Sequence, residues 1–341
     1  MSEVSANRDR ASTEQLRDAL ERSLSDHVGG SGRITSLARS PCVFTSSFAL
    51  EELAIETQDG AELKLMFKDL GGSGLSERAR SAKPEFLYDP LREIEVYRSI
   101  LSQADLGTAA FYGCAVDPAE DRYWLFIENV RGIALWQIGE LERWEAVARW
   151  AAALHGRYAE SGPPAAERLV HYDADLYRLW LRRAVDFADR WEAMRPGVGL
   201  KTIEWLADRY DPVVKCLENL PATFIHGELY ASNVLIASDA DTSRVCPIDW
   251  EIAAMGPGVI DLAALTMGWD RETRVALATA YTAHLQPDRL PTLDSFLETL
   301  DCARLHLAVQ WLGWAPDWRP PRSHRRDWIT EARTIAEELG L

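Results

Sequence analysis

A chain of 341 residues with a net charge of −16 is long enough for two packed lobes, and its acidity disfavours nucleic acid and anionic membranes as partners. Hydrophobic residues make up 47% and charged residues 26%, the balance of a globular protein. The five cysteines lack the spacing of zinc or redox sites, and no run of about 18 apolar residues could span a bilayer. We therefore expect a cytoplasmic protein whose acidic surface serves solubility or, alternatively, suits a cationic substrate.

The first third of the chain predicts one helix followed mainly by strands. Ser12–Gln15 has the pattern of a capping box, and apolar residues then recur at helical spacing to Leu24. Alternating apolar residues and an Asp59-Gly60 turn predict strands at 33–39, 48–57 and 61–69. A flexible polar stretch is expected from Gly71 to about Pro90, then a helix over 91–102 and strands near 111–116 and 123–128.

The rest of the chain is dominated by helical periodicity. Apolar stripes predict helices over 144–158, 175–193, 201–219, 271–285 and 292–313. Two short strands are expected at 234–237 and 244–248. A strand-rich part followed by a helical part predicts an α+β protein with two lobes.

The stretch from His226 to Asn233 carries the clearest chemical signal. In kinases a catalytic acid lies five residues before an Asn that binds metal, and a later Asp completes the metal site. Glu228 and Asn233 have this spacing, and Asp249 follows an apolar strand. An acid and an Asn at this spacing also occur by chance in most proteins. The His-Gly before them and the apolar-Asp-Trp pattern after them favour the functional interpretation.

These motifs resemble those of the aminoglycoside phosphotransferase family, which is related to choline and fructosamine kinases within the protein-kinase-like fold. Members carry an HGDxxxxN loop, an apolar-D-W/F-E segment and an Asp in a G-P-x-x-D context. The corresponding segments here are His226-Gly227-Glu228 to Asn233, Ile248-Asp249-Trp250-Glu251 and Gly256-Pro257 to Asp261. One position departs from the pattern, because Glu228 stands where the family has its catalytic Asp.

The resemblance implies a role for each matching residue. Glu228 would orient or deprotonate the acceptor, while Asn233 and Asp249 would bind Mg²⁺. Asp261 would hold the catalytic loop through its backbone amides. His226 would be a buried structural residue beneath that loop rather than a catalytic one.

The family also places a lysine at the end of an apolar strand, where it grips the phosphates of ATP or GTP. Lys68 matches this position, although a surface lysine at a strand end is the simpler alternative. Its expected partner is a Glu on the following helix. Glu93 shares the inward face of that helix with Val96 and Ile100, whereas Glu95 points about 200° away. We therefore select Glu93 and keep Glu95 as the alternative.

Two further segments are expected to contact the nucleotide. The loop between the first two strands has no glycine, but the hydroxyls and backbone N–H groups of Ser46 and Ser47 could contact phosphate. The alternative is an ordinary turn. Adenine is expected to bond the backbone between Glu128 and Val130.

The resemblance therefore implies a bilobal protein-kinase-like fold with a small β-rich N-lobe, a larger, mostly helical C-lobe and a nucleotide cleft between them. We expect a helix-bearing N-terminal extension at 1–32, a nucleotide-binding N-lobe at 33–130 and a C-lobe at 131–341. The expected reaction moves the γ-phosphoryl group of ATP (or GTP) to a hydroxyl of a small molecule and depends on Mg²⁺.

Glu228 keeps a second hypothesis open. Its extra methylene moves the carboxylate by about 1 Å relative to Asp, and such a misplacement can cost ~100-fold in rate. The alternative function is a nucleotide-binding pseudokinase that acts as a regulatory or binding module. A kinase for protein substrates is weaker, because the segment between Asp249 and Asp261 contains no recognisable activation segment.

Aromatic residues near the C-terminus are candidates for the acceptor site, because an aromatic and acidic pocket would suit a cation. The candidates are Trp269, Trp311, Trp314 and Trp318, with Asp270 and Asp317 beside two of them. Tryptophans at helical spacing are more often part of a core.

Overall fold

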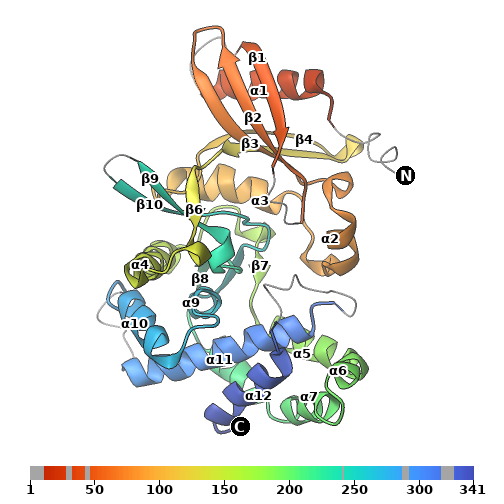
Figure 1. Ribbon diagram of the computed structural model, residues 1–341, viewed down its shortest axis with the longest axis vertical. Helices are drawn as coiled ribbons and strands as arrows, with labels where there is room; N and C mark the ends of the chain where they lie inside the picture. Colours follow the sequence, from red (N-terminus) through yellow and green to blue (C-terminus); the bar gives the residue numbers. More distant parts are fainter. Residues whose placement is uncertain (1–10, 28–32, 43–46, 240–241, 286–291, 316–325) are drawn as a thin grey trace. The chain divides into compact units, whose positions relative to one another are not determined.

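Five antiparallel strands form the centre of the first of two units into which the chain divides (Figure 1). This computed structural model describes residues 11–27, 33–42, 47–239, 242–285, 292–315 and 326–341. Unit 1 contains Met1–Ser81 and Asp89–Arg131, and unit 2 contains Ala82–Tyr88 and Gly132–Leu341.

The sheet of unit 1 is packed against a single helix on one face. Its strands, in the spatial order β1-β2-β3-β5-β4, are β1 (Ile34–Pro41), β2 (Leu50–Thr57), β3 (Glu62–Asp69), β5 (Arg122–Glu128) and β4 (Phe111–Asp117). Helix α1 (Thr13–His27) buries Leu16 and Leu20 in one cluster with Phe67 and Phe126. Because successive strand residues point to opposite faces, Lys68 lies on the face away from α1.

Helix α1 begins with the capping box that its sequence predicts. The Gln15 N–H donates to Ser12 Oγ at 3.1 Å, and the Ser12 N–H donates to Gln15 Oε1 at 3.0 Å. These two bonds satisfy backbone donors that the first turn of a helix leaves without partners.

The segment after β3 is folded, and the prediction of a flexible stretch was wrong. It contains α2 (Glu77–Ala82), and Phe48 pairs with Leu75 in an antiparallel bridge. Within this segment, the Arg80 guanidinium donates to the Gly72 carbonyl oxygen at 2.9 Å. The helix expected over 91–102 starts as α3 (Arg92–Glu95) and continues as a π-helical turn over Val96–Ile100.

Unit 2 is mainly helical, as predicted. Its helices are α4 (Leu141–Tyr158), α5 (Ala174–Asp186), α6 (Ala188–Met194), α7 (Gly199–Ala207), α8 (Asp211–Glu218), α9 (Val259–Leu265), α10 (Arg271–Thr282), α11 (Leu293–Leu312) and α12 (Trp328–Glu338). Two expected helices, over 175–193 and 201–219, are each split in two. Pro212 explains the second split, because proline is tolerated in the first turn of α8 but not inside a longer helix.

Two small sheets in unit 2 carry the segments that contain Glu228, Asn233 and Asp249. One runs in the order β10-β9-β6, with β10 (Thr242–Pro247), β9 (Val234–Asp239) and β6 (Gly132–Ala134). The other runs in the order β7-β11-β8, with β7 (Val170–His171), β11 (Ala254–Pro257) and β8 (Ala222–Ile225). The chain from β8 to β9 forms the loop around Glu228, and β11 leads into the fully buried helix α9.

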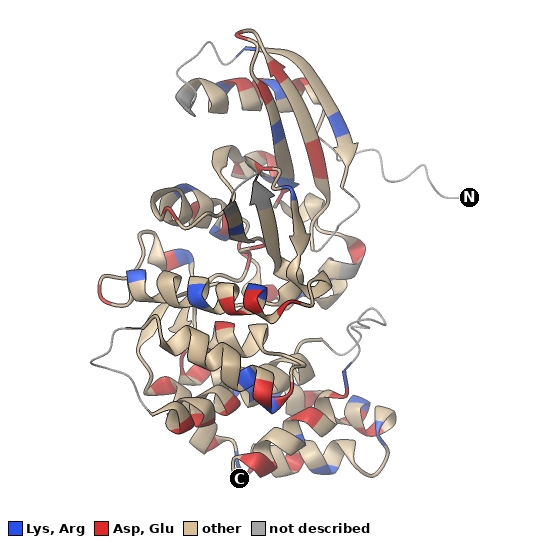
Figure 2. Cartoon of the chain, turned by 60° about the vertical axis from the view of Figure 1, so that its left-hand side comes forward, with Lys and Arg blue, Asp and Glu red and all other residues tan. Residues whose placement is uncertain are grey.

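Charged side chains occur throughout both units, and the acidic excess is not confined to one element (Figure 2). Among the residues that the structure describes, no helix is long and apolar enough to cross a membrane. A β-rich N-terminal sheet and a helical C-terminal part confirm the predicted α+β class.

Candidate functional site

In unit 1, Lys68 and Glu93 form a buried ion pair. Lys68 Nζ lies 2.6 Å from Glu93 Oε2, and their side chains are 5% and 2% exposed. The ammonium group also lies 5.5 Å from the centre of the Phe48 ring. Glu95 pairs with Arg98 and accepts a hydrogen bond from Ser99. Of the two acids considered for Lys68, Glu93 is therefore the one that contacts it.

The other unit 1 residues expected near a nucleotide belong to the loop before β2 and to the end of β5. Ser46 lies outside the described residues, whereas the Ser47 carbonyl oxygen accepts the Ser76 N–H at 2.9 Å. Glu128, at the end of β5, donates its backbone N–H to the Ala110 carbonyl oxygen at 2.8 Å. Its carboxylate accepts the Ala110 N–H at 3.1 Å. Adenine would therefore have to use backbone groups of the segment up to Val130 other than this N–H.

In unit 2, Asp261 fixes the start of the loop that follows β8. Its Oδ2 accepts the His226 N–H at 2.8 Å, and its Oδ1 accepts the Gly227 N–H at 2.9 Å. Asp261 is 0% exposed, so these bonds compensate a fully buried carboxylate. Gly227 has a φ of +82°, and a side chain there would collide with the Ile252 carbonyl. The sharp turn before Glu228 thus requires glycine.

His226 supports the same loop from below. Its Nδ1 accepts the Glu228 N–H at 3.2 Å, so Nε2 carries the proton and donates to the Ile248 carbonyl oxygen at 3.0 Å. The buried ring packs against Trp250, with ring centres 4.4 Å apart. This histidine connects the loop to the strand end that leads to Asp249.

The backbone around Glu228 is held by several hydrogen bonds. Its carbonyl oxygen accepts the Tyr230 N–H at 2.7 Å and Asn233 Nδ2 at 3.0 Å. Its N–H is bound by His226, as described above. The half-buried Glu228 side chain therefore starts from a fixed backbone position.

Asn233 and Asp249 are brought together by the pairing of β9 with β10. The Ile248 N–H donates to the Asn233 carbonyl oxygen at 2.8 Å, which extends the Val234–Pro247 register by one residue. Asp249 follows directly and has a φ of +68°, a left-handed conformation that is uncommon for residues other than glycine. Such backbone strain is often found where a side chain must be aimed at a ligand.

Asn233 and Asp249 fit a metal ion through their side-chain oxygen atoms. Because Asn233 Nδ2 is bound to Glu228, the amide presents Oδ1 as its ligand atom, and Ser232 Oγ lies 3.3 Å from it. Asp249 adds a carboxylate, and Mg²⁺ prefers such hard oxygen ligands with several waters. Among the described residues, no three or more His, Cys, Asp or Glu side chains are arranged so that they could hold a metal ion. A metal here would therefore use one carboxylate and one amide oxygen.

Lys83 and Glu251 form a second buried pair that the sequence analysis did not find. Lys83 Nζ lies 2.7 Å from Glu251 Oε2, and their side chains are 7% and 9% exposed. Glu251 stands two residues after Asp249, so this contact ties Ala82–Tyr88 to the strand end that carries Asp249. Glu251 belonged to a recognised motif, but no signal in the sequence indicated Lys83 as its partner.

Of the aromatic residues considered for the acceptor site, Trp311 contacts the loop between β8 and β9. Its Nε1–H donates to the Tyr230 hydroxyl oxygen at 3.0 Å. Burial, followed by the negative charge of Glu228, raises the pKa of Tyr230, which places this hydroxyl in the field of the Glu228 carboxylate. Sequence reasoning missed Tyr230, although it lies inside the recognised loop.

The other candidates have different positions. Trp314 stacks on Trp180 in the core, with ring centres 5.6 Å apart. Trp269 packs against Trp144, and Asp270 caps helix α10 by accepting the Thr273 N–H at 2.9 Å. Asp317 and Trp318 lie outside the described residues.

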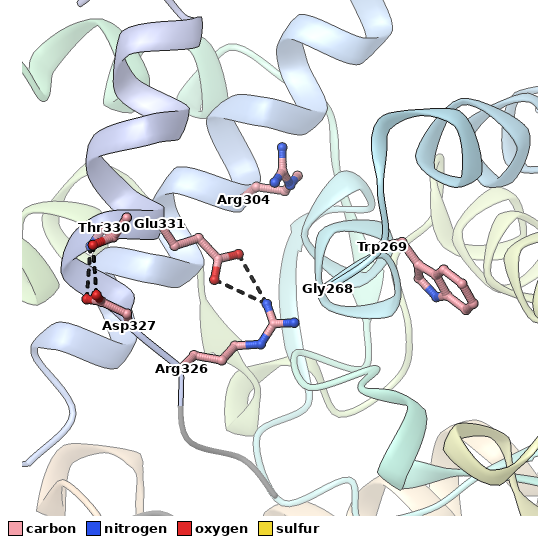
Figure 3. A pocket seen from close by; sticks show the side chains of 7 residues that line it. All are labelled: Gly268, Trp269, Arg304, Arg326, Asp327, Thr330 and Glu331. Carbon is pink, nitrogen blue, oxygen red and sulfur yellow. Dashed lines mark hydrogen bonds and ion pairs between the residues drawn. The ribbon is translucent and has the colours of Figure 1, made fainter.

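An open hollow of about 590 Å³ lies between the end of α9 and helices α11 and α12 (Figure 3). Two arginines line it, and each is paired with an acid: Arg304 with Asp301 at 2.6 Å and Arg326 with Glu331 at 3.2 Å. Trp269 is the one aromatic residue of its described lining. The hollow is thus a polar surface with both charges rather than an aromatic cage for a cation.

Comparison with known proteins identifies a family over the region that contains these motifs. A model of the phosphotransferase enzyme family matches residues 78–296, which is more than half of the chain. A search of curated proteins found no match.

Solved structures show the fold over nearly the whole chain. An ethanolamine kinase from Plasmodium vivax has 13% identity and a TM-score of 0.53, covering 90% of this chain and 83% of that one. A microcompartment-associated aminopropanol kinase has 18% identity and a TM-score of 0.56, covering 89% and 90%. The GDP complex of an aminoglycoside 2′-phosphotransferase-IIIa has 14% identity and a TM-score of 0.56, covering 96% and 98%. The predicted protein-kinase-like fold is therefore confirmed.

Proposed function

The chain belongs to the phosphotransferase enzyme family, and we propose that it transfers the γ-phosphoryl group of ATP or GTP to a hydroxyl of a small molecule in a Mg²⁺-dependent reaction. The observation that carries this proposal is the loop between β8 and β9. Asp261 fixes its start, Glu228 projects from a hydrogen-bonded backbone, and the Ile248–Asn233 bond brings Asn233 beside Asp249.

Each residue has a distinct part in the proposed reaction. Lys68, held in place by Glu93, donates to nucleotide phosphate oxygens. Asn233 Oδ1 and the Asp249 carboxylate hold Mg²⁺. Bound Mg²⁺ supplies neutralisation of the negative charge on the phosphates. The acceptor oxygen forms a bond to the γ-phosphorus, the bond from that phosphorus to the bridging oxygen breaks, and the nucleoside diphosphate leaves. Glu228 takes the proton of the acceptor hydroxyl.

Glu228 fits this proposal if the acceptor, rather than the loop, accommodates the longer side chain. The hydrogen bonds to its N–H and carbonyl oxygen leave the backbone little freedom to retreat. The carboxylate therefore extends about 1 Å further than that of an Asp, and the reactive hydroxyl lies correspondingly further from the loop.

The decisive experiment compares Asp249→Asn with wild type in a Mg²⁺-dependent transfer assay. The substitution preserves shape but removes the charge of a proposed metal ligand, so we expect transfer to fall by at least ~100-fold. Asp270→Asn is the matched control, because Asn also caps a helix and Asp270 serves α10. Equal rates for wild type and Asp249→Asn across a broad panel of hydroxyl acceptors would disprove the proposal.

A second pair of variants tests Glu228 itself. Removal of a general base typically costs 10²- to 10⁴-fold, so Glu228→Gln should lose about that factor. Glu228→Asp restores the usual family residue but withdraws the carboxylate, and we expect it to lower the rate by ~100-fold as well. If Glu228→Asp were faster than wild type, the acceptor would not be adapted to the longer side chain.

Amino alcohols and aminoglycosides are the first acceptors to test. The proteins of similar fold include kinases named for ethanolamine and aminopropanol, and the net charge of −16 suits cationic compounds. Neutral sugars of similar size provide the comparison that separates a requirement for charge from a requirement for hydroxyl groups.

The presence of Glu228 also supports an alternative, a nucleotide-binding pseudokinase. That function predicts that Mg²⁺-nucleotide raises the melting temperature while no phosphorylated product forms with any acceptor. Detection of a phosphorylated product by mass spectrometry would eliminate it.

A further inference from the structure

Unit 2 contains a partly open cavity whose lining includes none of the proposed catalytic residues. It has a volume of about 260 Å³ and lies among α4, the start of α9, and helices α10 and α11. Its walls are mostly apolar and include Ala159, Leu220, Val259 and Phe296. Figure 1 shows α4, α9, α10 and α11 as neighbouring helices of this unit.

Two buried polar side chains form part of the cavity wall. Tyr281 and His155 are each 3% exposed, and the Tyr281 hydroxyl lies 2.8 Å from His155 Nδ1. The Tyr281 ring stacks on Phe296, with ring centres 5.7 Å apart. Gly258 makes this arrangement possible, because a β-carbon there would come within 2.5 Å of both His155 Nδ1 and the Tyr281 oxygen.

These two residues connect the cavity to the catalytic loop. His155 Nε2 lies 3.1 Å from Asp261 Oδ2, the same oxygen that accepts the His226 N–H. An ionised carboxylate only accepts hydrogen bonds, so His155 donates from Nε2, and in its neutral form it accepts the Tyr281 O–H at Nδ1. Burial raises the pKa of Tyr281, which keeps its hydroxyl protonated. Three hydrogen-bond steps thus lead from the cavity wall to the backbone of His226 and Gly227.

We propose that this cavity binds a small, neutral aromatic molecule, and that its occupation stabilises the loop at His226–Gly227 through Tyr281, His155 and Asp261. The apolar walls and the stacked Tyr281–Phe296 rings favour an aromatic ligand. The volume is below the 300–1,000 Å³ typical of sites for drug-sized ligands, so the ligand has one or two rings.

The coupling follows from linkage between two equilibria. When the loop opens, Asp261 loses its hydrogen bonds to the loop amides, and the bond to His155 no longer holds Tyr281 in the wall of the cavity. A ligand that prefers the closed arrangement therefore makes opening rarer. The effect is reciprocal, because a stabilised loop raises the affinity of the cavity by the same factor.

Indole is a suitable probe, and binding to the full chain can be measured by isothermal titration calorimetry. For a ligand of this size we expect a Kd of ~0.1–1 mM. Gly156 lines the cavity from α4, and a β-carbon there meets no atom within 4 Å, so Gly156→Phe should fill the space and weaken binding at least ~10-fold. Ala153→Phe places the same side chain at an exposed position of the same helix that does not line the cavity, and it should bind indole like wild type.

The coupling is measured by amide hydrogen exchange of a peptide spanning Ile225 to Leu229. At ten times its Kd, indole should slow exchange of the His226 and Gly227 amides by up to ~10-fold in wild type. In Tyr281→Phe indole should still bind, but this protection should disappear. Absent binding, or equal binding to Gly156→Phe, would overturn the site. Binding without slower exchange, or equal slowing in Tyr281→Phe, would overturn the coupling. None of these measurements requires turnover, so they are independent of the proposed kinase activity.

Discussion

Each of the two units buries a lysine–glutamate pair, and the pairs have similar geometry but different surroundings. In unit 1, Lys68 and Glu93 are 2.6 Å apart at the end of β3; in unit 2, Lys83 and Glu251 are 2.7 Å apart beside the Asp249 turn. A buried ion pair is weak evidence for stability, because desolvation offsets much of the attraction. The two pairs therefore suggest different roles in positioning: under the proposed function the first holds an ammonium group for the nucleotide phosphates, while the second fixes a strand end.

The largest expected difference between the pairs is in activity. Lys68→Met removes a donor to phosphate oxygens, and we expect phosphoryl transfer to fall by ~100–1,000-fold. Lys83→Met removes no proposed ligand contact, so its rate should fall far less. Initial rates with Mg²⁺-nucleotide, measured below the melting temperature of each variant, test this order. Equal losses would mean that Lys83 also contacts the substrate or that neither lysine does.

The sequence predicted the Lys68–Glu93 pair but not the Lys83–Glu251 pair, and this difference shows what a sequence can predict. Glu93 could be selected for Lys68 because helical periodicity places it on the inward face of the next helix. Lys83 and Glu251 lie 168 positions apart, and neither periodicity nor a motif connects them. Residues that share one contiguous segment, such as Glu228 and Asn233, can therefore be recognised in the sequence. A contact that depends on tertiary packing is not.

The same distinction applies to the fold and to the proposed acceptor residues. The alternation of β3 and the stripe of α4 depend on local periodicity, and both elements formed as expected. The sequence could not show whether Trp314 belongs to the acceptor site or to the core, because only the tertiary structure shows that it stacks on Trp180. Asp270 did carry a local signal: it directly precedes an expected helix, the usual position of an N-cap.

The second expected effect concerns stability. It distinguishes a buried charge that has its partner from one that has lost it. Removing one member of a buried pair leaves the other charge uncompensated, so Lys83→Met and Glu251→Leu should each lower the free energy of unfolding by about 3–5 kcal/mol. The double variant leaves no buried charge and should lose clearly less than either single variant. The free energy of unfolding of wild type, the two single variants and the double variant is obtained from urea titrations monitored by tryptophan fluorescence. Additive losses in the double variant would mean that the two side chains do not compensate each other.

The smallest expected effect comes from His306, a group that tolerates burial by remaining neutral rather than by pairing. The ring is 0% exposed, and burial lowers its pKa to about 3. Its Nδ1 lies 2.8 Å from the Tyr210 hydroxyl, and its ring meets the Tyr177 ring edge to face at 4.7 Å. A proton on this ring would place a charge among aromatic side chains without a carboxylate described beside it.

The pH dependence of unfolding reveals this neutral histidine. Below pH 6.5 the unfolded chain binds a proton at His306 that the folded protein does not, so stability falls with decreasing pH until about pH 3. One such site contributes about 1.4 kcal/mol per pH unit. His306→Asn retains an acceptor for Tyr210 but cannot titrate. Between pH 6 and 4, the free energy of unfolding of this variant should therefore fall by about 1.4 kcal/mol less per pH unit than that of wild type. His284→Asn, at an exposed position near the end of α10, should keep the wild-type slope. If His306→Asn and wild type had the same slope, His306 would be protonated in the folded protein, and the helical core of unit 2 would have to compensate a buried charge as the two ion pairs do.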